Sequence, residues 1–589
     1  MKEIKAIRKA LDRAGFKDIG VEKWRQSVRL TGEVATWEEY LQAGYLAVGR
    51  GFREVVNHIQ VSGVEFEGGS IPQPPFQDSS LEGVHFDVVV VGGGVVGAAV
   101  ARELTRWEVR VAVLEKEEDL ARHASGRNNG MIHPAFAPSP GTRKAHYNAL
   151  GNRMFPQLSR ELGLQVEWPG TLALFPQKWF RLAVPLMYRR AWQNGVKGAR
   201  YLSPEKLQAW EPHLNPQYYG AFFMPEGGIV NPFQLTIAYG ENAVDNGAFI
   251  YLQTAVREMG VENDGGRRKV TRLHTNRGRI TASAVVNAAG VWADVIAGMA
   301  DDAYFSIKPR HGAVAILDKK ASSQLQHNVG VLALKEGTTK GGGVTPTTAG
   351  NVLIGPTAEE TPYREDYATY TGDMEQILHL HLPLIKTLRR DQVITYFAGT
   401  RASTFSEDFI IEISPRVSNL IHVAGIQSPG LSSVPAIAQE ASSLAVEAVQ
   451  RENGVELRQR ESFDPCRRPT PDLKLLSLEE RSRLIQENPD YGRIVCRCEG
   501  VSRGEVVDSL HTPLEVNTLD GVKRRVRAGM GRCQGGFCTP RLLDILSREQ
   551  DVPVEEIGKA GFGSELVKRR TKEGDGCREA KEASTESWS

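Results

Sequence analysis

The sequence predicts an α/β protein built from several structural units, and three observations support this prediction. The chain has 589 residues, well beyond the about 250–300 residues at which a single hydrophobic core stops growing. A strand, a glycine-rich turn, a helix and a second strand follow one another from 85 to 115, as in a parallel βαβ unit. Segments rich in proline, glycine or charge interrupt the chain at 68–75 and 451–468, where we expect linkers.

The composition is that of an ordinary globular protein, with 41% hydrophobic and 24% charged residues. Because 72 basic residues balance 71 acidic ones, no nucleic-acid partner is expected. No run approaches the ~20 apolar residues of a transmembrane helix, and the N-terminus lacks the apolar core of a signal peptide. We therefore expect a cytoplasmic protein without a transmembrane segment; peripheral membrane contact through a partner is left open.

Residues 1–64 predict a small α+β domain, followed by a linker at 65–85. Its expected elements are an N-terminal helix, a strand at 28–34, a helix at 37–49 and a strand at 55–61. The strand motifs V-x-L-x-G-x-V and V-x-N-x-I-x-V resemble those of BON-type domains, a resemblance that implies lipid or protein binding. Of the two roles, we prefer protein docking: a module without chemistry of its own is favoured over a lipid-binding domain.

The βαβ pattern carries the marks of a Rossmann-like dinucleotide site. Gly92 permits a tight turn after the first strand, Gly94 lets the backbone approach a pyrophosphate, and Gly97 lets the helix pack closely. The helix N-terminus offers free N–H groups to the phosphates. Glu115 ends the second strand, where an acidic side chain accepts hydrogen bonds from ribose hydroxyls.

Four further motifs, at 124–133, 225–232, 285–294 and 423–431, resemble those of the D-amino-acid-oxidase-type FAD superfamily. That superfamily includes glycerol-3-phosphate and 2-hydroxyglutarate dehydrogenases. The resemblance implies FAD and, over 86–450, a Rossmann-like FAD-binding domain with an inserted mixed β-sheet substrate domain. The residues that would contact FAD are Gly92, Gly94, Gly97, Glu115, Lys116, Ser125, Arg127, Asn128, Gly130, Ala289, Gly290, Gly425 and Gly430.

Four residues are candidates for substrate chemistry. Arg401 matches the arginine with which related enzymes hold a substrate anion, and a guanidinium suits a carboxylate or phosphate. Arg310 and His311 fall where the family turns into its substrate domain and would supply an anion contact and a base. His133 is either the base that removes the hydroxyl proton or a residue that holds the flavin ring. A structural ion pair or a packed core histidine is the alternative for each.

Four of the six cysteines form a C-x-C pair and a later C-x₄-C pair: Cys496, Cys498, Cys533 and Cys538. Four thiolates suit an iron–sulfur cluster or zinc. The segment 491–560 resembles the small helical BFD-like domain, which implies a [2Fe-2S] cluster, with zinc less favoured. Helices are expected at 501–510 and 539–546, a linker at 451–490, and a disordered tail at 561–589. Cys466 and Cys577 are expected to be free thiols.

Together, the motifs favour a dehydrogenase of a small anionic alcohol, with glycerol 3-phosphate first. A two-electron flavin beside a one-electron cluster indicates that electrons leave through the cluster to a partner protein or a quinone. Two groups of alternative substrates remain: 2-hydroxy acids such as 2-hydroxyglutarate, and amines, amino acids or opines. A non-catalytic redox sensor is the alternative from another class, and it predicts no turnover.

Overall fold

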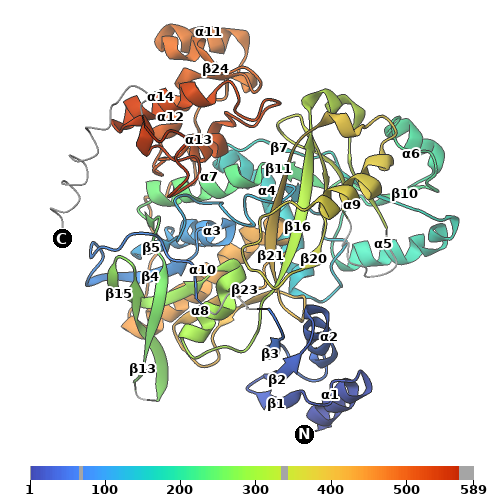
Figure 1. The fold of residues 1–589 in the computed structure, drawn as a ribbon, viewed down its shortest axis with the longest axis vertical. Helices are drawn as coiled ribbons and strands as arrows, with labels where there is room; N and C mark the ends of the chain where they lie inside the picture. The colour runs from blue at the N-terminus through green and yellow to red at the C-terminus, as the bar shows by residue number, and fades with distance from the viewer. Residues whose placement is uncertain (1, 65–69, 265, 333–341, 570–589) are drawn as a thin grey trace. The chain divides into compact units, whose positions relative to one another are not determined.

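The computed structural model describes residues 2–64, 70–264, 266–332 and 342–569 (Figure 1). The chain divides into two compact units, Met1–Pro469 and Thr470–Ser589. Most of the expected tail, together with Cys577 and part of the first linker, lies outside the described residues. Among the described helices, none is both long enough and apolar enough to cross a membrane.

The N-terminal domain contains the elements expected from the sequence and one more strand. Strand β2 pairs in parallel with β3 and antiparallel with the unpredicted β1, whose five residues include the polar pair Glu22 and Lys23. Thr36 and Glu39 form a capping box that fixes the start of α2. The elements are α1 (Lys2–Arg13), β1 (Gly20–Trp24), β2 (Ser27–Val34), α2 (Trp37–Ala47) and β3 (Val55–Val61).

This N-terminal domain packs against the rest of the first unit. Phe405 lies in its hydrophobic core, and a Cβ on Gly44 would come within 2.1 Å of the Phe405 ring. The Val55 carbonyl accepts a hydrogen bond from Ser306 N at 3.0 Å. Residues 2–64 are therefore held against the rest of the first unit by an apolar anchor and a backbone hydrogen bond.

The predicted βαβ unit forms the centre of a largely parallel sheet. Strand β4 pairs in parallel with β5 and with β15, and β15 pairs in parallel with β23. Helices α3 and α10 pack together beside this sheet (Figure 1). The elements are β4 (Val84–Val91), α3 (Val95–Leu104), β5 (Val111–Leu114), β15 (Gly278–Asn287), β23 (Leu420–Ala424) and α10 (Gly430–Asn453).

The second large sheet is mixed, as expected for the inserted substrate domain. Its strand order is β20-β16-β19-β18-β17-β8-β10-β9, and β21 adds to β16. Strands β17 and β8 are parallel, whereas the long pair β16 and β21 is antiparallel and places Arg310 opposite Arg401. The strands are β8 (Thr171–Leu174), β9 (Arg200–Leu202), β10 (Ala221–Met224), β16 (Lys308–Leu317), β17 (Asn328–Val331), β18 (Gly343–Pro346), β19 (Val352–Gly355), β20 (Glu359–Glu360) and β21 (Val393–Ser403).

The second unit is mostly helical. Helix α12 begins two residues later than expected because Val501 and Ser502 form a short strand, and the Ser502 side chain caps the helix. Helix α14 runs four residues beyond its expected end. The elements are α11 (Leu478–Glu487), β24 (Ile494–Cys496), β25 (Val501–Ser502), α12 (Arg503–Leu510), α13 (Leu519–Val526) and α14 (Thr539–Gln550).

The segment expected as a linker, 451–490, carries more structure than that expectation. Arg460 N donates to the Arg106 carbonyl at 2.7 Å, and Gln459 forms a β-bridge with Trp107. The first part of the segment therefore belongs to the first unit, whereas α11 belongs to the second. The sequence pattern missed this because the contacts join residues more than 350 positions apart.

Candidate active site and cysteine cluster

The glycine turn after β4 has the geometry expected of a dinucleotide site. Gly92 adopts a φ of +108°, and a Cβ on Gly97 would lie 1.9 Å from the Gly92 carbonyl oxygen. Gly94 is the N-cap of α3 and makes no side-chain cap, while Val95 N donates to Ser125 Oγ at 2.8 Å. The positive end of α3 therefore opens toward the cavity, where it would stabilise phosphate groups.

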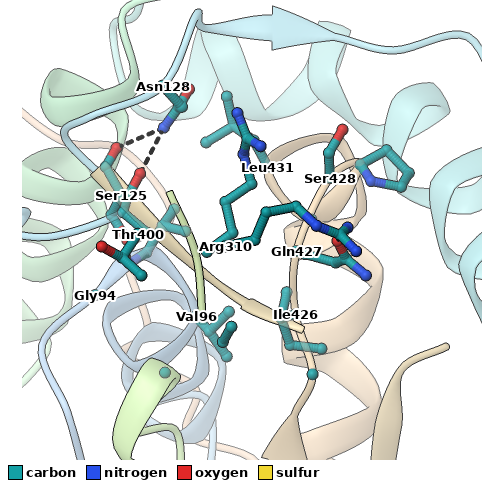
Figure 2. Close-up of a pocket in the computed structure, with 18 of the residues that line it drawn as sticks. Gly94, Val96, Ser125, Asn128, Arg310, Thr400, Ile426, Gln427, Ser428 and Leu431 are labelled. Carbon is teal, nitrogen blue, oxygen red and sulfur yellow. Dashed lines mark hydrogen bonds between the residues drawn. The ribbon is translucent and has the colours of Figure 1, made fainter. Parts of the chain in front are cut away.

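A cavity of about 1060 Å³ extends from this turn to the segment after β23 (Figure 2). Two of the predicted cofactor residues, Gly97 and Gly130, lie behind the wall of the cavity and do not line it. Gly130 adopts a φ of +67°, and a Cβ on it would lie 2.2 Å from the Val230 carbonyl oxygen. The other eleven line the cavity: Gly92, Gly94, Glu115, Lys116, Ser125, Arg127, Asn128, Ala289, Gly290, Gly425 and Gly430. The cavity thus joins motifs spread over more than 300 residues.

Glu115 lies at the carboxyl end of β5, on the cavity wall. Its side chain accepts hydrogen bonds from Gly93 N at 2.6 Å and from Glu117 N at 2.9 Å. Burial raises the pKa of this carboxyl group. The Lys116 ammonium pairs instead with Glu117 and with Glu365. A buried acid in this place can accept hydrogen bonds from a ribose, as the glycine turn requires of a bound FAD.

Arg310 enters the cavity from β16, inside a buried network of charges. Its guanidinium donates to Gln427 Oε1 at 2.8 Å, beside which it lies in Figure 2. It also pairs with Glu360 and Glu407, both of which bind Lys308 as well. Two carboxylates therefore compensate the two cations, which makes Arg310 a held, oriented group rather than an open anion site.

Arg401 faces the same cavity from the neighbouring strand. Its guanidinium donates to the Thr357 carbonyl at 3.1 Å, and within the described part of the chain no carboxylate forms an ion pair with it. Burial and the positive charge of Arg310 lower the pKa of Arg401 to about 10. A cation destabilised in this way favours an anionic ligand, because the ligand's charge would offset both effects.

His133 follows β6 (Met131–Ile132) and lines the cavity. Its backbone N donates to Ser432 Oγ at 2.6 Å, and its Nε2 lies 3.4 Å from Ser428 Oγ. Burial lowers the pKa of the imidazole to about 4, so the ring is neutral near pH 7. A neutral ring nitrogen in the cavity can accept a proton.

His311 lies on the opposite side of β16 from Arg310, because successive strand residues alternate in direction. Its Nε2 is 3.0 Å from the Ala368 carbonyl, and its Nδ1 is 3.6 Å from Asp373. It is not among the residues that line the cavity. The structure thus brings Arg310, Arg401 and His133 together, and leaves His311 packed beneath the strand.

Sequence reasoning missed Tyr45 and Gln427, two of the residues that line the cavity. Tyr45, from α2 of the N-terminal domain, lines the cavity and donates to Glu360 at 2.9 Å. Gln427 accepts from Arg310 and from Ser403 Oγ at 2.9 Å. Gln427 lies inside the motif at 423–431, which was a usable signal, but no local pattern links Tyr45 to the cavity.

The four cysteines of the second unit converge as two pairs. Cys498 Sγ lies 3.6 Å from Cys533 Sγ, and the neighbouring thiol of Cys538 lowers the pKa of Cys496. A Cβ on Gly531 would lie 2.3 Å from the Cys498 Cβ, so this loop approaches only because it carries glycine. Each pair takes one cysteine from each motif, a donor set that fits a cluster of two irons with two thiolates each. Cys466 is exposed and free.

Comparison with protein-family models shows to which family the chain belongs. Residues 87–444 match the model of the FAD dependent oxidoreductase family. The chain belongs to this family. Residues 494–548 of the flavoprotein match the BFD-like [2Fe-2S] binding domain. These matches confirm the predicted FAD and [2Fe-2S] cofactors and the prediction of an oxidoreductase.

Two relatives of the chain carry the names of glycerol 3-phosphate dehydrogenases. The flavoprotein is 39% identical to a glycerol 3-phosphate dehydrogenase from Caloramator mitchellensis, over 83% of this chain and 99% of that protein. It is 25% identical to one of the subunits of anaerobic glycerol-3-phosphate dehydrogenase from Escherichia coli (strain K12), over 78% and 88% of the two chains.

A solved structure confirms the fold class. The dithionite-reduced L-α-glycerophosphate oxidase from Mycoplasma pneumoniae with FAD bound has a TM-score of 0.59 and 25% identity to this chain. The match covers 65% of this chain and 98% of that one. The mixed α/β architecture predicted from the sequence is therefore that of a known FAD-binding protein.

Proposed function

We propose that this flavoprotein is a dehydrogenase of glycerol 3-phosphate. The observation that carries the proposal is Arg401, a half-buried cation that lines the FAD cavity beside Arg310 and has no carboxylate ion pair among the described residues. A phosphate group would supply the missing negative charge and accept two parallel hydrogen bonds from the guanidinium. The relatives named as glycerol 3-phosphate enzymes support this choice.

Arg401, Arg310 and His133 then each have a distinct part in the reaction. Arg401 would bind the substrate phosphate, while Arg310, fixed by its acidic partners, would orient Gln427 at the cavity wall. His133, neutral at pH 7, would accept the proton of the alcohol that is oxidised. When bound, FAD supplies the acceptor for the substrate hydride.

The cysteine cluster provides the exit for electrons. Cys496, Cys498, Cys533 and Cys538 would hold the [2Fe-2S] centre, whose chemistry is the transfer of one electron at a time. We propose a protein partner or a quinone as the acceptor, because a one-electron carrier in the same chain serves no purpose in direct two-electron chemistry.

The proposal is tested by an anaerobic titration of the purified holoprotein. Glycerol 3-phosphate should bleach the flavin absorbance and produce the EPR signal of a reduced [2Fe-2S] cluster. If the flavin stays oxidised while dithionite still produces the cluster signal, the substrate proposal fails. The 2-hydroxy acids and the amines would then be tested in the same assay.

Residues 1–64 are proposed to be a BON-like domain, on the support of their strand motifs and their α+β arrangement. Its contacts with Phe405 and Glu360 give it a role in forming the cavity as well as in docking. We also propose a cytoplasmic location for this flavoprotein.

A further inference from the structure

One segment of the substrate domain exposes large apolar side chains to solvent. It comprises η1 (Lys178–Ala183) and α5 (Val184–Gln193), at one edge of that domain in Figure 1. Leu182 is 83% exposed, Leu186 66% and Trp192 81%. Leu182 lies in η1, and Leu186 and Trp192 lie on α5. Single exposed apolar residues are ordinary, but several within one short segment indicate an interaction surface. We name residues 178–193 the α5 surface.

The same segment is strongly basic. No acidic residue occurs between Glu167 and Glu205 in the sequence. Glu205 and Glu226 lie near two of the cations, Arg181 and Lys197, and leave an excess of positive charge. The basic residues are Lys178, Arg181, Arg189, Arg190, Lys197 and Arg200.

We propose that the α5 surface binds directly to a membrane of anionic lipids, with its helix lying in the plane of the bilayer interface. Along the chain, Leu182 and Leu186 lie between two exposed tryptophans, Trp179 and Trp192, and tryptophan favours the level of the lipid headgroups. Exposed cations such as Arg189 flank them and would contact the headgroups. Because no acidic residue occurs from 168 to 204, the charge of this surface is complementary to a membrane of anionic headgroups.

The α5 surface is attached to the wall of the FAD cavity. Arg190 Nε donates to the Phe136 carbonyl at 3.0 Å. Asn194, the residue that follows the surface, donates through Nδ2 to the carbonyls of Ala135 at 2.7 Å and Pro138 at 2.9 Å. Phe136 and Pro138 both line the cavity. Membrane contact would thus hold the flavin domain at the bilayer, where a quinone or a membrane-bound acceptor is found; this consequence rests on the proposed function.

The test is sedimentation of the full-length holoprotein with lipid vesicles, without substrate. Vesicles with equal parts of phosphatidylglycerol and phosphatidylcholine should carry the protein down, and vesicles of phosphatidylcholine alone should not. High salt should weaken the binding, because it screens the cations. The variant Leu182→Glu/Trp192→Glu should lower the partition coefficient by about tenfold or more.

A matched control is the variant Leu478→Glu/Phe562→Glu. Both residues are 81% exposed but lie in the second unit, so the control adds the same charge and should bind vesicles as the wild type does. Failure of the wild type to bind anionic vesicles, or equal binding by the α5 variant, would overturn the proposal. So would a dimer in solution that the α5 variant abolishes. Flavin reduction by glycerol 3-phosphate, measured without vesicles, tests the substrate separately.

Discussion

The Tyr45 hydroxyl donates a hydrogen bond of 2.9 Å to Glu360 Oε1, across 315 positions of the chain. Glu360 also pairs with Arg310 and Lys308, and these cations lower its pKa to about 2. Tyr45 belongs to the N-terminal domain, whereas the other three belong to the substrate domain. The N-terminal domain therefore completes the charge network beside the substrate site.

Removing this hydroxyl should weaken substrate binding. In Tyr45→Phe, Glu360 loses one donor and holds Arg310 less firmly, so KM should rise a few-fold, by about 0.5–1.5 kcal/mol, with kcat little changed. Steady-state kinetics with a dye acceptor measure this. The comparison variant is Tyr40→Phe, whose hydroxyl bonds to Asn57 O within the same domain. A KM that is unchanged in Tyr45→Phe would mean that the contact is only structural.

Local physics explains which parts of the site were predictable. The roles of Gly92, Gly94 and Gly97 depend on a turn of six residues, so the sequence located them before the structure did. The position of Arg310 opposite Arg401 depends on the register of two strands far apart in sequence. Because successive side chains of β16 point to opposite faces of the sheet, only one of Arg310 and His311 can face the cavity. The sequence did not indicate which of the two it is.

Tyr45 was beyond sequence reasoning for a different reason. Its residue type and helix position are ordinary, and its role arises only because Phe405 anchors the N-terminal domain on the rest of the first unit. The cysteine positions, in contrast, were predictable because their spacing alone indicates metal ligation. Their pairing across the two motifs came only from the structure.

Arg401 should be required for anionic substrates and dispensable for neutral ones. In Arg401→Ala the phosphate loses a charged hydrogen-bond donor, so KM for glycerol 3-phosphate should rise about tenfold to a hundredfold, or about 1.5–3 kcal/mol. KM for glycerol, which has no charge, should hardly change. Arg401→Lys should recover part of the loss, since it restores the charge without the bidentate geometry. Equal losses for both substrates would contradict a phosphate contact.

His133 should control the chemical step and its acid limb. His133→Asn should lower kcat by about 10²–10⁴-fold with little effect on KM. Because burial lowers the pKa of His133 to about 4, kcat/KM of the wild type should fall only when the pH drops toward that value and the ring becomes protonated. His311→Asn is the comparison variant, as its ring lies outside the cavity. A large loss of rate in His311→Asn alone would transfer the role to that residue.

Glu54 should make the N-terminal domain less stable at alkaline pH. It is 2% exposed, bonds to Ser406, and has a pKa raised to about 7 by burial. Since the folded pKa exceeds the unfolded one of 4.5, this contribution to stability is complete below pH 4.5 and is lost as the pH rises through 7. The loss amounts to about 3 kcal/mol. Glu54→Gln should abolish it.

Hydrogen exchange of β2 and β3 at pH 5 and pH 8 measures this difference. The wild type should show less protection at pH 8 after correction for intrinsic exchange, and Glu54→Gln should not. Glu38→Gln, on the exposed side of α2, serves as the control because that side chain lies in water in both states. Parallel pH dependence in the wild type and Glu54→Gln would exclude Glu54 as the cause.

Substitution of Cys498 should separate reduction of the flavin from the later transfer of electrons through the cluster. In Cys498→Ser the pair with Cys533 loses one thiolate, so the absorbance and EPR signal of the [2Fe-2S] cluster should disappear. Glycerol 3-phosphate should still bleach the flavin at the wild-type rate, because the cavity is intact. Transfer to a one-electron acceptor should fall by at least about tenfold, because the cluster no longer takes electrons from the flavin. That loss of rate corresponds to about 1.4 kcal/mol or more. Cys466→Ser, which changes an exposed free thiol, should alter none of these signals. Undiminished one-electron transfer in Cys498→Ser would show that electrons leave the flavin by another route.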